Sequence, residues 1–398
     1  MKKIPPVFED FQNPYKVFHH TKKIEQLKNS GDTTPIHITV GLTNFCNHKC
    51  PWCYINWNQS GQQNKRSGTD RPAPKPIQVD IKIIEALKEA KEMGLKAITI
   101  VGDGEPTLHK KFNYIIDEIK KLKLDIGIFS NMSFKKKEIF DSFLKNFFFV
   151  RCSIDAANKY SHQKSHLSDD FELIVNNIKN LVKLRGKNKF PVIGAQYVCN
   201  HWNYKEVPEA AKFFKSLGID YVTFKPMYKN ELNPNHEINS LKNEEVIPFL
   251  EEAKKEQNEN FKVYMKISQF KEVLGNNYND GVYYKKCNAT PLAPYLDEDG
   301  SVQLCGNLKG RGFELGNIYE KSFKEIWLSE ERKKIINKIN LKKCPAGCKL
   351  DPLNKVLWDN FNKEGVFSDN TSELNQKLSS AENLNENEIK RIHPNFIG

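Results

Sequence analysis

The sequence predicts an α/β protein in which a parallel sheet curls into a barrel and a small α+β domain follows it. Apolar, strand-like segments alternate with amphipathic, helix-like segments from Ile36 to Lys225, as in parallel sheets that are buried on both faces. Polar or glycine-containing turns follow several of the strands, where parallel α/β proteins collect ligands. Four of the nine cysteines occur after residue 283, beside a hairpin signal, so a second domain is expected there.

Six strand and helix units are countable in the first domain. Their strands are expected at residues 36–40, 97–101, 125–130, 147–154, 191–198 and 221–224. The helix expected at 79–93 places Ile81, Ile84, Leu87 and Ala90 on one apolar stripe. Periodicity alone does not distinguish a barrel from an open doubly wound sheet, but no Gly-x-Gly-x-x-Gly turn follows the first strand, which disfavours a dinucleotide-binding fold.

The chain divides into four expected regions. An N-terminal extension at 1–35 precedes the barrel domain at 36–282, and the second domain at 283–362 precedes a polar tail at 363–398. The tail is rich in Ser, Asn, Glu and Lys, although its last residues are apolar.

Three cysteines fall within eight residues, as C-x3-C-x2-C at Cys46, Cys50 and Cys53. Three thiolates on a tight loop can hold three corners of a cubane iron–sulfur cluster and leave the fourth iron open to an outside molecule. The alternative is structural zinc, which prefers four closed ligands in well-separated pairs. Disulfides are disfavoured because nothing marks the chain as secreted.

A turn at the end of the next expected strand completes a motif. Residues 97–101 form a buried strand that delivers Gly104, Glu105 and Pro106 onto this turn. The cysteine loop followed by a Gly-Glu-Pro turn resembles the radical S-adenosylmethionine (SAM) superfamily, whose fold is a partial (β/α)6 barrel. The resemblance implies that the three cysteines ligate a 4Fe-4S cluster, that the Gly-Glu-Pro turn takes the amine of SAM, and that Trp52 lies near the adenine.

The same resemblance implies the chemistry. SAM chelates the open iron, and reduction of the cluster cleaves the sulfonium to give a 5'-deoxyadenosyl radical that abstracts hydrogen from the substrate.

Further candidate residues lie at other strand ends. Asn131 resembles the asparagine of the family's Thr-Asn-Gly element, although Ser130 and Met132 replace its neighbours, and Ser153 resembles a serine that contacts SAM. Strand alternation places Ser153 and Arg151 on one face and Cys152 on the other.

Two thiols remain outside the cluster motifs. Some superfamily members use an extra cysteine to return a hydrogen atom to the substrate radical, so Cys152 and Cys199 are candidate catalytic residues. The alternative for each is a small buried packing residue. Gln196 and Lys225 are candidate polar groups of the barrel interior.

The second domain contains Cys287, Cys305, Cys344 and Cys348. An Asp-Gly reversal before Cys305 predicts a hairpin. The C-x12-G-x4-C spacing, a Gly-Asn-Ile segment before a Trp-containing helix, and a closing cysteine pair resemble the SPASM/twitch extension of radical SAM enzymes. That resemblance implies one auxiliary 4Fe-4S cluster, while four thiolates equally satisfy tetrahedral zinc.

The net charge and the expected compartment limit the classes of partner. The net charge is +12, but the lysines lie in or beside helix-like stretches and no basic stripe is interleaved with aromatic residues, so no nucleic-acid partner is expected. We expect a cytoplasmic protein without a membrane partner, because no signal peptide or spanning segment is evident and iron–sulfur thiolates need a reducing compartment. A flavodoxin or ferredoxin is the expected electron donor.

These features favour a radical SAM enzyme that oxidises or epimerises a small polar substrate, such as a carbohydrate, an aminocyclitol or a nucleotide-linked metabolite. The lean towards a small substrate rests on an N-terminal extension too short for a separate peptide-binding domain. The alternative is a maturase that modifies a ribosomally made peptide. Two alternatives from other classes are a two-cluster electron carrier and a zinc-containing RNA-binding protein.

Overall fold

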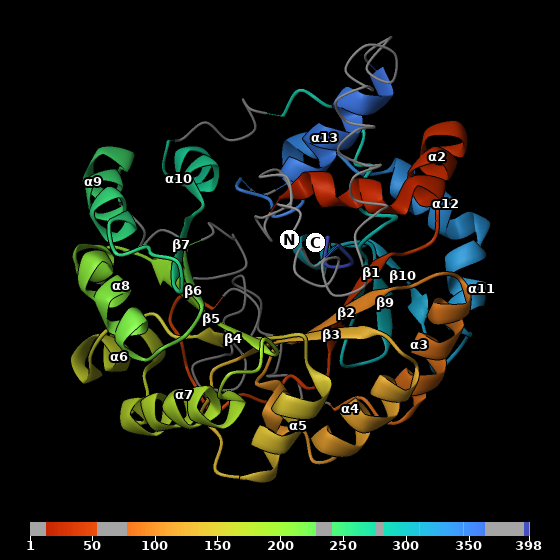
Figure 1. The fold of residues 1–398 in the computed structure, drawn as a ribbon. Helices are drawn as coiled ribbons and strands as arrows, with labels where there is room; N and C mark the ends of the chain where they lie inside the picture. The colour runs from red at the N-terminus through yellow and green to blue at the C-terminus, as the bar shows by residue number, and fades with distance from the viewer. Residues whose placement is uncertain are drawn as a thin grey trace, which may run out of the picture.

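A strongly curved sheet with helices on its outside forms most of the protein (Figure 1). This computed structural model describes residues 13–53, 78–227, 241–275, 282–309, 311–344, 346–362 and 394–397. The strand order is β10-β9-β8-β1-β2-β3-β4-β5-β6-β7, so β1 to β7 follow one another in sequence, all parallel. The strands are β1 (His37–Gly41), β2 (Ala97–Val101), β3 (Asp125–Ser130), β4 (Phe149–Ser153), β5 (Val192–Cys199), β6 (Tyr221–Pro226), β7 (Lys262–Met265), β8 (Tyr295–Leu296), β9 (Ser301–Gln303) and β10 (Glu314–Asn317).

Helices connect successive parallel strands, as required for a parallel barrel. The α-helices are α2 (Thr21–Ser30), α3 (Lys82–Glu92), α4 (Phe112–Lys121), α5 (Glu138–Asn146), α6 (Lys159–His166), α7 (Phe171–Arg185), α8 (Val207–Ser216), α9 (Asn243–Lys254), α10 (Ile267–Leu274), α11 (Phe323–Leu328), α12 (Glu330–Asn337) and α13 (Asp351–Asn362). Short 3-10 helices are η1 (Pro14–His20), η3 (Pro106–Leu108), η4 (Tyr204–Glu206), η6 (Gly306–Leu308) and η7 (Leu341–Lys343).

The predicted partial barrel is confirmed, with each of the six expected strands present. A seventh parallel strand, β7, was not predicted. The predicted hairpin is also confirmed as β8–β9, where the Gly300 N–H donates to the Asp297 carbonyl over 3.0 Å and Gly300 adopts φ +83°. Strand β8 lies parallel to the free edge of β1, so the second domain extends the barrel sheet.

The two faces of the barrel strands differ in chemistry. Alternate residues such as Ile38 and Ile98 pack outwards in the main apolar cluster with the helices. The inner face carries polar and aromatic residues, and Gly127 makes room there because a Cβ at that position would lie 2.2 Å from the Phe149 ring. The expected helix stripe needs one correction: α3 begins at Lys82, so Ile81 is 48% exposed and Ile83 takes the buried position.

The segment 394–397 fills the amino-terminal end of the barrel. Phe396 is 5% exposed, and its ring contacts His37, Phe148 and Phe149 with centroid separations of 5.7, 5.9 and 5.0 Å. The Asn395 side chain donates to a carboxylate oxygen of Asp125 at the start of β3 over 2.6 Å. The apolar end of the tail is therefore part of the barrel floor.

A second apolar cluster joins the N-terminal helices to α13, with Val17, Phe18 and Leu27 packing against Leu353 and Leu357. The region expected as an N-terminal extension thus contributes to the core under the second domain. No helix in the described ranges has the length and apolar character needed to cross a membrane.

Trp327 on α11 locks the second domain to the N-terminal segment. Its side chain is fully buried, its ring stacks on Phe323 at a centroid separation of 5.7 Å, and its indole N–H donates to the Thr33 carbonyl over 3.1 Å. The Arg332 guanidinium lies 4.5 Å from the ring centroid.

We expect Trp327→Ala to lower the free energy of unfolding by roughly 3–5 kcal/mol, because the change leaves a cavity and an unpaired Thr33 carbonyl. Urea unfolding measures the loss, with the half-exposed Tyr114→Ala as the control. Equal stability of the two variants would contradict a locking role.

Candidate functional site

The cysteine loop and the Gly-Glu-Pro turn lie side by side at the carboxyl ends of β1 and β2. The Gly104 N–H donates to the Thr43 carbonyl over 3.0 Å, and the Glu105 N–H donates to the Phe45 carbonyl over 2.8 Å. A Cβ on Gly104 would lie 2.1 Å from the Phe45 carbonyl oxygen. Glycine at 104 is therefore required for the two loops to meet.

The structure brings Cys46, Cys50 and Cys53 together on this loop. The pKa of Cys46 is raised to about 12, mainly by burial and to a smaller extent by the neighbouring Glu105 and Cys53. Burial also raises the pKa of Cys50 well above its ordinary value, followed by the effects of Cys53 and Cys46. Three mutually interacting soft donors of this kind fit an iron–sulfur cluster, since metal binding is what stabilises thiolates in such a site.

Glu105 is 3% exposed and its carboxylate accepts four hydrogen bonds. The Thr107 N–H, the Thr107 hydroxyl and the Ser130 hydroxyl donate to Oε1 over 3.1, 2.6 and 2.8 Å, and the Asn131 N–H donates to Oε2 over 2.7 Å. The carboxylate thus joins the ends of β2 and β3.

Asn131 connects β3 to the cysteine loop. Its side-chain amide donates to the Asn47 side-chain oxygen over 2.8 Å, and the Asn47 amide in turn donates to the Ser133 carbonyl over 3.0 Å. Asn47 stands between the first two cysteines, so this contact orients the loop that carries them.

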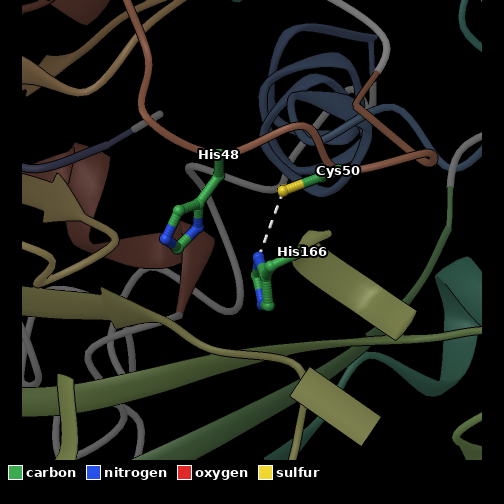
Figure 2. A group of neighbouring side chains, drawn as sticks. All are labelled: His48, Cys50 and His166. Atoms are coloured by element: carbon green, nitrogen blue, oxygen red, sulfur yellow. Dashed lines mark hydrogen bonds between the residues drawn. The ribbon is translucent and has the colours of Figure 1, made fainter. Parts of the chain in front are cut away.

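Helix α6 supports the cysteine loop from below through His166 (Figure 2). The His166 Nδ1 lies 3.1 Å from the Cys50 sulfur, and the Lys49 N–H donates to the His166 carbonyl over 3.0 Å. The Trp52 indole N–H donates to the Ser165 carbonyl over 2.9 Å. Burial lowers the pKa of His166 well below its ordinary value, and the neighbouring His48 and His162 lower it further, so the ring is neutral.

Asp170 holds two further buried histidines beside His166, namely His48 and His162. It accepts hydrogen bonds from Nε2 of His48 and Nε2 of His162, each over 2.9 Å, and from the Ser133 and Ser168 hydroxyls. Burial alone would raise the pKa of Asp170, but the bonds from His162 and His48 bring it well below its ordinary value.

The barrel interior beneath the loop is polar. Arg151 packs over Phe129 with 4.5 Å between guanidinium carbon and ring centroid, and its Nε donates to the Tyr221 hydroxyl over 3.1 Å. Burial raises the pKa of Asp155 to about 7 and lowers that of Lys225 to about 8, while each group's charge opposes the shift of the other.

Strand register places Ser153 opposite Gln196, both partly buried. The expected interior polar residues therefore share this face with Arg151. Cys152 and Cys199 instead lie in the main apolar cluster, fully buried, where burial raises the pKa of each thiol. Their surroundings favour the packing alternative.

The four cysteines of the second domain also converge. The charges of Cys287 and Cys305 contribute to the raised pKa values of both Cys344 and Cys348, after the larger effect of burial. A pocket opens beside them, lined in part by Cys287, Cys344 and Cys348. This tetrad of soft donors around a pocket fits a cluster in which every iron is ligated.

Two asparagines that sequence reasoning missed donate to these sulfurs. The Asn354 side chain donates to Cys287 over 3.4 Å, and the Asn307 side chain donates to Cys348 over 3.7 Å. Asn354 also accepts the N–H groups of Asn288 and Ala289. No local motif marks Asn354, because it lies on α13, far along the chain from Cys287.

A cluster of buried charges lies between the cysteine triplet with its Gly-Glu-Pro turn and the cysteine tetrad of the second domain. Lys309, four residues after Cys305, contacts Asp103, Asp297 and Glu298 over 2.5, 2.7 and 3.3 Å. Burial raises the pKa values of Asp103 and Glu298 to about 7 each. Burial would lower the pKa of Lys309, but the three carboxylates raise it above its ordinary value.

Comparisons with known proteins agree with this geometry. Residues 40–214 match the family described as the radical SAM superfamily, and residues 287–349 match the SPASM iron–sulfur cluster-binding domain. The tungsten-containing aldehyde ferredoxin oxidoreductase cofactor-modifying protein of Pyrococcus furiosus is 23% identical over 304 residues, which cover 74% of this chain and 81% of that protein. The sporulation killing factor maturation protein SkfB of Bacillus subtilis is 28% identical over 186 residues, which cover 46% of this chain and 40% of that protein.

Solved structures share the fold. Streptococcus suis SuiB bound to its precursor peptide SuiA superposes with a TM-score of 0.60 at 18% identity, covering 84% of this chain and 77% of SuiB. The protein anSMEcpe with bound SAM superposes with a TM-score of 0.55 at 15% identity, covering 87% of this chain and all of anSMEcpe. The chain is therefore an enzyme of the radical SAM superfamily, with a SAM-binding 4Fe-4S cluster and a C-terminal iron–sulfur cluster domain of the SPASM type.

Proposed function

We propose that the protein modifies a peptide by abstracting hydrogen from one of its residues. The observation that supports hydrogen abstraction is the contact between the cysteine loop and the Gly-Glu-Pro turn, because it places three thiols beside a turn at the open end of the barrel. With a cluster and SAM bound there, the cofactor pair supplies a 5'-deoxyadenosyl radical.

In this proposal the residues have separate duties. Cys46, Cys50 and Cys53 ligate the SAM-binding cluster, and the tetrad Cys287, Cys305, Cys344 and Cys348 ligates the auxiliary one. The remaining thiols are Cys152 and Cys199, so the sequence has enough cysteines for one four-thiolate auxiliary cluster.

The turn and strand ends hold SAM. Gly104, Glu105 and Pro106 take its amine, Ser153 and Asn131 take its other polar groups, and Trp52 borders the adenine. Because the Glu105 carboxylate already accepts four hydrogen bonds, we assign part of its effect to the shape of the turn.

The peptide assignment draws on the relatives and replaces the expectation of a small sugar-like substrate. SkfB is a maturation protein for a sporulation killing factor, and the barrel fold of SuiB is known in complex with a precursor peptide. The polar interior around Arg151 and Lys225 offers cations for carboxylate or carbonyl groups of such a peptide.

A second candidate substrate is a cofactor. The Pyrococcus furiosus relative, which matches the larger share of this chain, is named a cofactor-modifying protein.

Under either assignment we place the enzyme in the cytoplasm with a flavodoxin or ferredoxin as the reductant, because thiolate-bound clusters need a reducing compartment. The auxiliary cluster then accepts the substrate electron in an oxidation, or relays electrons.

A protease experiment separates the two candidates. Extract from cells grown in deuterated medium is ultrafiltered, incubated anaerobically with the reduced protein and SAM, and deuterium in 5'-deoxyadenosine is scored by mass spectrometry. Deuterium transfer that disappears after protease treatment of the extract supports a peptide. Transfer that survives protease supports a cofactor and overturns the peptide assignment.

Replacing any one of Cys46, Cys50 and Cys53 by Ala should abolish SAM cleavage, because two thiolates do not retain the cluster. Iron should fall from about eight to about four atoms per chain, as expected for loss of one of two 4Fe-4S clusters. The matched control is Cys152→Ala, which should keep both iron and cleavage. Turnover in any triplet variant would refute the ligand assignment.

Glu105→Gln should weaken SAM binding and lower thermal stability, with the cluster retained. An amide placed among four donors leaves a buried N–H facing another donor, at a cost of roughly 1–3 kcal/mol. Calorimetric titration with SAM and a thermal melt measure the two effects, and the exposed Glu330→Gln is the control. Unchanged SAM affinity with reduced stability would show that Glu105 serves the fold alone.

A further inference from the structure

The imidazole of His166 faces the sulfur of Cys50 from a buried position. His166 is 1% exposed, and its Nδ1 lies 3.1 Å from the Cys50 sulfur, within the range of an N–H···S hydrogen bond. In Figure 2 the ring points directly at the sulfur from the end of α6, whereas His48 lies to the side of this line.

Backbone hydrogen bonding determines which ring nitrogen of His166 carries the proton. The Asp155 N–H donates to Nε2 over 3.1 Å, whereas the Asp155 carboxylate oxygen Oδ2, 3.5 Å from the same nitrogen, makes no hydrogen bond within the described part of the chain, so Nε2 is the acceptor and is unprotonated. The proton of the neutral ring is then on Nδ1, and Nδ1–H is directed at the Cys50 sulfur.

Neighbouring groups keep the ring in this orientation. Its centroid lies 5.1 Å from that of His48 and 4.7 Å from that of His162, and Asp170 holds both of these rings through their Nε2 atoms. The His166 main chain is itself bound to the cysteine loop through Lys49. Rotation of the imidazole away from the sulfur would therefore break several buried contacts.

We propose that His166 is a positioning residue that raises the reduction potential of the SAM-binding cluster by donating its Nδ1–H to Cys50. Hydrogen bonds to cluster sulfurs favour the reduced, more negatively charged state, and they are among the factors that set iron–sulfur potentials. The inference rests on the proposed function, since it takes Cys50 as a cluster ligand.

The test is a redox titration followed by EPR on the full chain with both clusters loaded. In His166→Phe the ring shape stays but the donor is lost, so at a fixed solution potential the ratio of reduced to oxidised cluster should fall roughly tenfold, about 59 mV for a one-electron couple. In His166→Asn the side-chain N–H replaces Nδ1–H, and the potential should stay near that of the parent protein. The control is His37→Phe, which removes an equally buried histidine, 1% exposed, at the opposite end of the barrel and should leave the potential unchanged.

Two results would overturn the inference: an unchanged potential in iron-replete His166→Phe, or an equal drop in His166→Asn. If His166→Phe fails to load iron, pulsed EPR of the parent protein with ¹⁵N-labelled histidine decides, because the inference requires a histidine nitrogen coupling to the cluster and its absence refutes it. The triple variant with Ala at Cys46, Cys50 and Cys53 identifies the auxiliary signal. If that variant keeps both signals, the proposed ligand set fails, which is distinguishable from failure of the His166 assignment alone.

Discussion

Strand β1 is paired along both edges, and this double pairing determines where both groups of thiols lie. One edge pairs with β2, which delivers the Gly-Glu-Pro turn to the cysteine loop, and the other pairs with β8, which begins the hairpin before Cys305. Backbone hydrogen bonds are directional, and those from Ile36, His37 and Thr39 to the segment that leads into β8 restrict rotation of the second domain against the barrel. The cysteine triplet and the cysteine tetrad are therefore held by one continuous sheet.

Lys309 adds an electrostatic link between the barrel and the second domain. Three buried carboxylates surround its ammonium group: one is on Asp103, just before the Gly-Glu-Pro turn, and two are in the β8–β9 turn. Removal of the lysine would therefore leave like charges in a poorly solvated space. Burial raises the pKa values of Asp103 and Glu298 to about 7, so each of these carboxyl groups is partly protonated near neutral pH. The cost of burying these charges offsets much of the stability that the ion pairs add. The cluster nevertheless couples the Gly-Glu-Pro turn to the loop after Cys305.

How much could be read from the sequence depended on how far apart the interacting residues lie in the chain. The triplet at Cys46 and the Gly-Glu-Pro turn are contiguous motifs, and the six strands have long apolar runs, so both were predictable. By contrast, Cys50 and His166 are 116 positions apart, and His48 and Asp170 are 122 apart, so their pairing is a product of the tertiary fold. Strand β7 was missed because it is short and only one of its four residues is fully buried, which leaves no clear apolar run.

The expectation of a small sugar-like substrate rests on a weaker argument than the fold does. The short N-terminal region suggests that a peptide-binding domain is absent, yet η1 and α2 form part of the core with α13, so the length of that region carries no information about the substrate. Asn354 likewise has no local sequence signature. Its side chain donates to Cys287, which is distant in the sequence and is brought near only by folding.

The floor made by Phe396 has a topological consequence for a long substrate. Since aromatic rings fill the amino-terminal end of the barrel at β1 and β4, a polypeptide that enters the interior past the cysteine loop cannot pass through and emerge on the other side. Any stretch that goes in must come back out over the same rim or through the side of the barrel where the edge strands β7 and β10 of the described sheet do not pair with each other. The residue presented to the radical would then lie either at a chain terminus or at a bend, and a substrate held straight along the barrel axis by its own rigid secondary structure would be rejected.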